Sequence, residues 1–179
     1  DVRKIEYYNS DSYAHQKENL YRELKNKKIA VFIGDHKKFD PRLEARVGEF
    51  AVKFKAPVII DHTSSYHGEN STLLSRITSM RGLMNKPDII IDMGSITGDY
   101  NVGWLNGIEA WRLSEDGQIH DRFRNQTKLF DGREELFFEI FDKQPSGVVD
   151  YYNQLFKEIK DMTMPTLPLS NTFVAYELS

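Results

Sequence analysis

Lys28-Ile-Ala-Val-Phe-Ile-Gly34 is the stretch of sequence that decides the fold. Its apolar residues are continuous and do not alternate with polar ones, and a glycine ends the run. This pattern is typical of a strand covered on both faces, because neither face then has to be polar. Pro57 to Asp61 and Asp88 to Met93 repeat it. The sequence therefore predicts three buried strands near the centre of one sheet.

The segments between these strands favour helices. Asp40 followed by Pro41 is typical of a helix start, because Asp accepts hydrogen bonds from free amides and Pro has none to lose. The apolar residues that follow recur with the helical period: Leu43, Val47, Phe50, Ala51 and Phe54. We therefore expect an α/β fold, a Rossmann-like three-layer α/β/α domain with a mostly parallel sheet of about six strands.

The remaining segments set the expected boundaries. Residues 1–11 are polar and irregular, and Ser12 is expected to cap a helix that ends near Lys25. Short helices are expected around 73–77 and 96–105, and further strands at 108–113, around Ile119 and Phe123, and at 128–130. Two amphipathic helices are expected from residue 133 and after residue 147. Residues 161–179 contain two prolines and read as a connector, so the domain is placed at 12–160.

Composition limits the classes of function. The chain has 179 residues, 40% of them hydrophobic, and a formal net charge of −3, so it lacks the basic excess of a nucleic-acid partner. No apolar run is long enough for a membrane span. The absence of cysteine excludes disulfides and thiolate metal sites, and we expect a soluble cytoplasmic protein.

Gly34-Asp35-His36 is the candidate cofactor-binding segment. It follows a predicted strand, where doubly wound sheets bind ligands. It contains one glycine, whereas a dinucleotide fingerprint has three, and the next helix starts six residues later. A weak nucleotide crevice and an ordinary turn between strand and helix both remain open.

The other polar groups predict no catalytic set. Asp61-His62 with His67 and Glu69 could ligate a metal or form a solvated loop, and no further ligand completes the group. The nucleophile motif Gly-x-Ser-x-Gly and the Walker phosphate loop are missing. The carboxylate pairs Glu134-Glu135 and Asp88/Asp92 are interpreted as helix caps or solvated groups. We therefore predict no catalytic residue and no metal ligand.

Several segments, in this order, resemble the middle domain of thiamine-diphosphate-dependent enzymes: 28–34, 53–61 with Thr63-Ser-Ser-Tyr66, and 86–91. They look most like 2-succinyl-5-enolpyruvyl-6-hydroxy-3-cyclohexene-1-carboxylate synthase of menaquinone biosynthesis, with acetolactate-synthase-like enzymes as relatives. There the third strand leads into a Gly-x-x-Leu-Thr-Gly-type segment and a Trp-containing strand with a nearby Asp. The counterparts here are Gly94-Ser-Ile-Thr-Gly98, Trp111 and Asp121.

The resemblance implies a structural domain within a larger enzyme. Thiamine diphosphate and magnesium would bind in flanking domains, which are the implied partners in a homo-oligomer, and this chain alone would bind no cofactor. Residues 1–11 would link to an absent upstream domain, and 161–179 would connect to and start an absent diphosphate-binding domain. The implied reaction is decarboxylation of a 2-oxo acid and transfer of the acyl unit.

One departure bears on the substrate. The menaquinone enzyme has a Lys-Arg pair where this chain has Asp99-Tyr100, and an acidic side chain repels carboxylate substrates. The acyl donor and acceptor therefore stay open. The alternative functions are a module that binds FAD or ADP at Gly34 and an interaction module without a catalytic role.

Overall fold

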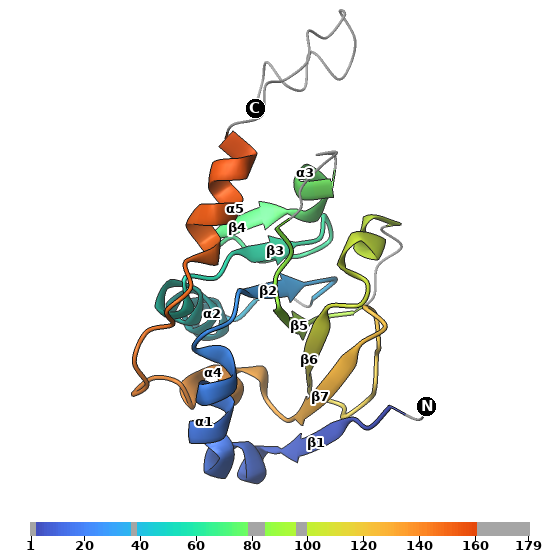
Figure 1. The fold of residues 1–179 in the computed structure, drawn as a ribbon. Coiled ribbons are helices and arrows are strands. Elements are labelled where there is room, and N and C mark those ends of the chain that lie inside the picture. The colour runs from blue at the N-terminus through green and yellow to red at the C-terminus, as the bar shows by residue number, and fades with distance from the viewer. Residues whose placement is uncertain (1–2, 37–38, 79–84, 96–99, 161–179) are drawn as a thin grey trace, which may run out of the picture.

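The computed structural model describes residues 3–36, 39–78, 85–95 and 100–160. Their strands form one seven-stranded sheet in which all neighbouring pairs are parallel, in the order β1-β7-β6-β5-β2-β3-β4. In Figure 1 the sheet runs from β4 at the top to β1 at the bottom. The strands are β1 (Glu6–Asn9), β2 (Ile29–Ile33), β3 (Val58–Ile60), β4 (Ser71–Leu73), β5 (Ile89–Met93), β6 (Glu109–Ser114) and β7 (Gln126–Asp131).

Helices cover both faces of this sheet. One hydrophobic cluster joins the sheet to α1 (Ser10–Leu24), α2 (Pro41–Phe54) and α4 (Glu134–Glu139). A second cluster joins the other face to α3 (Leu74–Thr78), the 3-10 helix η1 (Tyr100–Leu105) and α5 (Tyr151–Lys160). The predicted Rossmann-like α/β/α class is therefore confirmed, with seven strands in the described part of the chain where about six were expected.

Sequence patterns missed the two edge strands. β1 lies within the segment that was expected to be irregular, and it pairs with β7. β4 pairs with β3 and follows the polar loop. Both edges carry polar residues, because an edge strand has one side open to solvent and does not need a continuous apolar run.

Two local expectations were wrong. Ile119 and Phe123 form no strand, since residues 115–125 connect β6 to β7 irregularly. Phe123 is nonetheless fully buried, and its ring packs edge-on against Phe32 at 5.3 Å. The first helix begins at Ser10, and Asn9 caps it by accepting a hydrogen bond of 2.9 Å from the Ser12 amide. The expected connector over 161–179 and the start of the helix expected at 96–105 lie outside the described residues.

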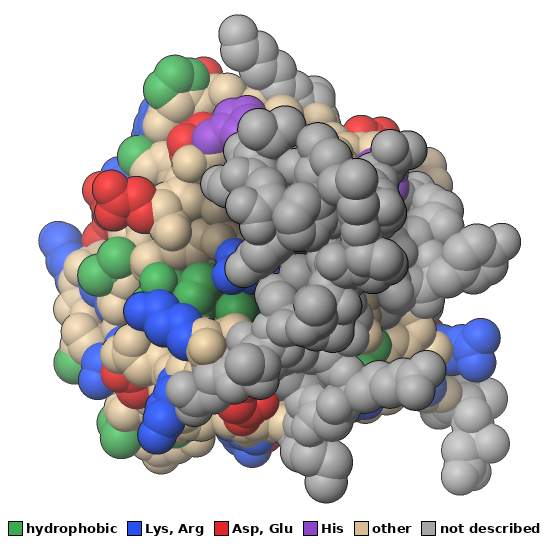
Figure 2. Space-filling view, turned by 90° about the horizontal axis from the view of Figure 1, so that it is seen from above, with side chains coloured by type: hydrophobic (Ala, Val, Ile, Leu, Met, Phe, Trp, Pro, Cys, Tyr) green, Lys and Arg blue, Asp and Glu red, His purple; other side chains and the backbone are tan. Residues whose placement is uncertain are grey.

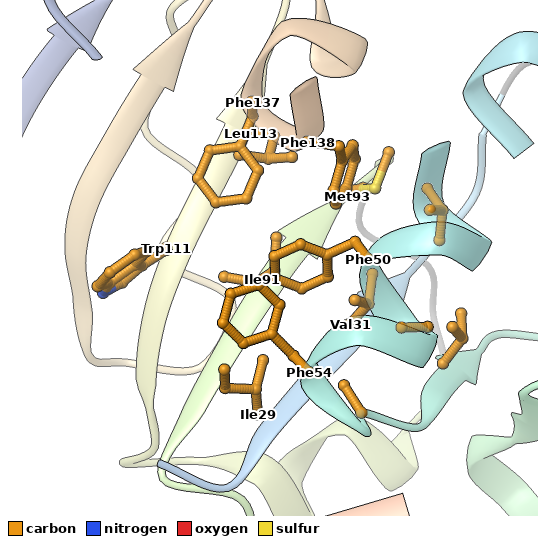
Figure 3. Packing of buried hydrophobic residues seen from close by; sticks show 14 of the residues in the cluster. Ile29, Val31, Phe50, Phe54, Ile91, Met93, Trp111, Leu113, Phe137 and Phe138 are labelled. Carbon is orange, nitrogen blue, oxygen red and sulfur yellow. The ribbon is translucent and has the colours of Figure 1, made fainter. Parts of the chain in front are cut away.

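α2 follows its prediction closely. The Asp40 side chain accepts a hydrogen bond of 2.7 Å from the Arg42 amide, and Pro41 opens the helix. Figure 3 shows Phe50 and Phe54 projecting from α2 into the cluster around Ile91. Aromatic rings of α2 and α4 pack against each other there, and the ring centroids of Phe50 and Phe138 are 5.3 Å apart. Such aromatic contacts add to the burial of apolar area.

Replacing Phe50 with alanine should strongly destabilise the fold. The side chain is 3% exposed, so its removal leaves a cavity that costs about 3–5 kcal/mol of unfolding free energy. Val52 lies on the same helix at 69% exposure, and Val52→Ala should change that free energy by less than about 0.5 kcal/mol. Urea unfolding of both variants measures the difference, and equal losses would contradict the packing described above.

Candidate functional site

The topology places two loops side by side at the carboxyl ends of β2 and β5. The chain leaves β2 towards β3 on one side, whereas β5 pairs with β2 on the other. This is the switch point at which open α/β sheets bind ligands. The Gly34 amide donates to the Met93 carbonyl at 3.0 Å, and Asp35 forms an antiparallel bridge with Ser95. The two loops are therefore bonded directly to each other.

Glycine at positions 34 and 94 permits this close approach. A Cβ on Gly34 would overlap the Ser95 carbonyl oxygen and would lie 2.6 Å from Nη1 of Arg122. Gly94 has a φ of +74°, which side chains disfavour, and a Cβ there would lie 2.7 Å from the Asp35 carbonyl oxygen. The space beside Gly34 is thus filled by the chain itself.

The Arg122 side chain packs against both loops, at Gly34 and at Gly94. Its side chain is 1% exposed, and Nη2 donates to the Gly94 carbonyl at 3.1 Å. The guanidinium lies over the Phe32 ring, 4.9 Å from its centroid. Nη1 has no hydrogen-bond partner among the described residues. Arg122 lies in the irregular connection between β6 and β7. A buried guanidinium therefore comes from a loop and not from a strand or helix.

Asp92 and Arg112 complete a buried network with Arg122. Asp92 lies in β5 opposite Arg112 of β6, and Arg112 Nη1 donates to Asp92 Oδ2 at 3.2 Å. Asp92 Oδ1 lies 3.6 Å from Nε of Arg122. The side chains of Asp92 and Arg112 are 1% and 8% exposed. Three ionisable side chains therefore lie together in the buried interior.

Burial and the neighbouring opposite charges shift the pKa values of Asp92 and Arg122 in opposite directions. Burial raises the pKa of Asp92, while the positive charges of Arg122 and Arg112 oppose that rise. Burial likewise lowers the pKa of Arg122, and Asp92 opposes that change. The Asp92 carboxylate is the group that both arginines pair with, so its loss would leave two like charges buried beside each other.

The structure accounts for the other two residues of the candidate segment. Asp35 is exposed beyond the bridge. His36 Nε2 lies 2.7 Å from Oε2 of Glu134, and both side chains are nearly buried, at 5% and 6% exposure. The His36 ring also packs 4.3 Å from the Phe39 ring. His36 thereby ties the loop after β2 to the start of α4.

The loop after β3 does not assemble a metal site. Asp61 is buried, and its Oδ1 accepts a hydrogen bond of 3.1 Å from the Thr63 amide and lies 2.7 Å from His62 Nδ1. His67 and Glu69 are exposed. Within the described ranges, no group of three or more His, Cys, Asp or Glu side chains could hold a metal ion.

Sequence reasoning missed the network and misread one member. Asp92 was interpreted as a capping or solvated carboxylate, and that interpretation is wrong because the residue is 1% exposed and paired. The available signal was a charged residue inside a continuous apolar strand, which requires a partner. Nothing in the sequence indicated that Arg122, thirty residues further on, would be one of its partners.

The fold and this site define a Rossmann-like α/β domain whose switch-point crevice is filled by its own arginine. Searches against protein-family models and against curated proteins find no match for the chain. Among the described residues, no helix is both long and apolar enough to cross a membrane. Seen from above, the described surface mixes acidic and basic side chains (Figure 2).

Substitution of Gly34 separates its two interpretations. If the glycine serves the contact between loops, Gly34→Ala costs about 1–3 kcal/mol of unfolding free energy through overpacking against Ser95. A Cβ at Gly103 meets only an atom at 3.8 Å, so Gly103→Ala should stay within about 0.5 kcal/mol. Thermal and urea unfolding compare them, and an unchanged stability for Gly34→Ala would favour a ligand crevice.

Removal of the central carboxylate should be more damaging. Asp92→Asn removes the carboxylate that pairs with the buried Arg112 and Arg122, and we expect a loss of about 3–5 kcal/mol in unfolding free energy. Asp11→Asn, at an exposed position in the first turn of α1, is the matched control and should have a far smaller effect. Urea unfolding at neutral pH gives both values. Similar losses in the two variants would show that the network contributes little.

Proposed function

We propose that this chain is the central α/β domain of a thiamine-diphosphate-dependent carboligase, in which it spaces and orients the domains that bind the cofactor. In this proposal the full enzyme decarboxylates a 2-oxo acid and transfers the acyl unit, as the resemblance to the menaquinone synthase implies. The observation that carries the proposal is the filled switch-point crevice. Arg122 takes the place that a ligand occupies in many sheets of this class.

The order of the resembling segments supports the same function. They contain β2, β3 and β5, which are neighbours at the centre of the sheet. Trp111, the tryptophan of the following segment, lies in β6 beside β5. Segments that are separate in sequence thus form one contiguous framework. A domain that only spaces others needs such a framework and no reactive group of its own.

The described residues do not fit the cofactor itself. No cluster of metal ligands is present in the described ranges to hold magnesium with a diphosphate. Asn125, a possible amide ligand, instead donates to the Gly107 carbonyl at 3.0 Å. The proposal therefore assigns thiamine diphosphate and magnesium to the flanking domains, and no step of the reaction is derived from this chain.

Binding of FAD or ADP is the alternative. It would require the loops at Gly34 and Gly94 to separate and Arg122 to turn towards a phosphate. The backbone β-bridge between Asp35 and Ser95 opposes that separation of the loops. An interaction module without a catalytic role is the other alternative, and it shares the framework but needs no neighbouring cofactor domains.

The test compares the 179-residue chain with the longer product of its reading frame. We expect calorimetry to show thiamine diphosphate binding with magnesium to the longer product only, and we expect only that product to release carbon dioxide from a 2-oxo acid. Turnover by the chain alone, or a longer product without cofactor binding, would refute the proposal. Stoichiometric FAD or ADP binding by the chain alone would establish the alternative.

Within the longer product, a matched pair of variants tests the spacer role. Arg122→Met should lower the melting temperature and leave KM for the 2-oxo acid unchanged, because the buried side chain does not contact substrate. Arg124→Met, at an exposed position two residues on, should change neither quantity. A raised KM with unchanged melting temperature in Arg122→Met would instead place this residue in a binding site.

A further inference from the structure

A groove of about 600 Å³ runs between α2 and residues 66–70, and it shares no lining residue with the buried network. On the α2 side its wall is small or apolar at Ala45, Gly48 and Val52. This stripe faces away from the core stripe that begins at Leu43. Val52 is 69% exposed, and a Cβ at Gly48 would meet only the Tyr66 hydroxyl, at 3.9 Å. Another polypeptide can therefore approach the helix backbone closely.

The rim of the groove is acidic. Its lining includes the carboxylates of Glu44, Glu49 and Glu69, and none of the described residues that line it is Lys or Arg. Glu49 is paired with Arg46 at 2.9 Å. Glu44 and Glu69 form no ion pair with any described residue. The groove thus presents two carboxylates, one from each wall, that no cation of the described residues pairs with.

The floor of the groove contains an unpartnered hydroxyl. Tyr66 is 1% exposed, and its hydroxyl has no hydrogen-bond partner among the described residues. Burial, with a smaller effect of the Glu44 charge, raises the pKa of Tyr66 to about 12, so the hydroxyl is neutral at physiological pH. Native proteins rarely leave a buried polar group unbonded, so each instance calls for an explanation.

Gly68 lies directly against this hydroxyl. A side chain at Gly68 would overlap the Tyr66 ring and oxygen, so that position must lack one. The backbone at Gly68 is held by a hydrogen bond of 2.7 Å from the Ser71 hydroxyl to its carbonyl. Tyr66 and Gly68 both line the groove, so the unpartnered hydroxyl lies beside the space that a ligand in the groove would occupy.

We propose that this groove is a docking site for a polypeptide segment that carries an arginine or lysine side chain. The cation lies between Glu44 and Glu69, and the Tyr66 oxygen accepts a hydrogen bond from it. The backbone of the segment lies along the exposed stripe that ends at Val52. The open groove suits a polypeptide because a small ligand is normally buried over most of its surface. The proposal does not depend on the function proposed above.

The test uses the 179-residue chain and a capped hexapeptide of alternating alanine and arginine. We expect saturable changes in the amide NMR spectrum that centre on Gly48, Gly68 and Glu69, and we expect none with the glutamine counterpart of the peptide. Changes scattered over the acidic surface, or equal changes with the uncharged peptide, would overturn the proposal.

Two variants distinguish docking from general attraction. Glu44→Gln combined with Glu69→Gln should weaken peptide binding about tenfold or more, because both ion pairs are lost. The control, Glu18→Gln combined with Glu158→Gln, removes the same charge from α1 and α5 and should weaken binding less than twofold. If both double variants bound the peptide equally weakly, the loss of affinity would follow from net charge alone, and the proposed site would be refuted.

The hydroxyl has a separate test. Tyr66→Phe should weaken peptide binding about threefold to tenfold while the melting temperature stays the same or rises, because the buried oxygen bonds to none of the described residues in the free chain. A fall in melting temperature with unchanged peptide affinity would show that the hydroxyl only supports the fold, and this part of the proposal would fail.

Discussion

The ion pairs among Asp92, Arg112 and Arg122 are the constraint on which the rest of the structure depends. An open, doubly wound sheet sends its chain to opposite sides at a switch point, and this opens a crevice at the carboxyl ends of the strands. In this protein a guanidinium fills it, and one carboxylate compensates for two positive charges. A buried pair of this kind adds little net stability, but losing one member leaves the others uncompensated. The network therefore fixes how β5, β6 and the following loop are arranged.

This arrangement bears on function through rigidity. The loops after β2 and β5 are bonded to each other, and the loop after β2 is also bonded to α4 through His36 and Glu134. Ligand-binding crevices usually keep such loops free to close on a substrate. Loops bonded in this way are consistent with the spacer role that we propose, and the acidic groove beside α2 is the separate docking surface that we propose.

Strands and helices could be predicted from sequence where apolar residues follow a regular pattern along the chain, and they were missed where no such pattern exists. β2, β5 and α2 have apolar patterns of strand or helix period, so their positions could be predicted. β1 pairs with a strand more than a hundred residues away, and as a polar edge it shows no such pattern. Phe123 was wrongly assigned to a strand. A single apolar residue in the sequence indicates burial, but it does not indicate whether the residue lies in a strand, a helix or a loop.

The sequence by itself determined the α/β class, the central strands and the inward face of α2, because solvent exclusion acts on residues close together in the chain. It also located Gly34, Asp35 and His36 after the first central strand. Only the tertiary structure decided what surrounds them. Arg122 reaches Gly34 and Asp92 through a loop without periodicity, and a contact between side chains so far apart in sequence depends on how the whole sheet is assembled.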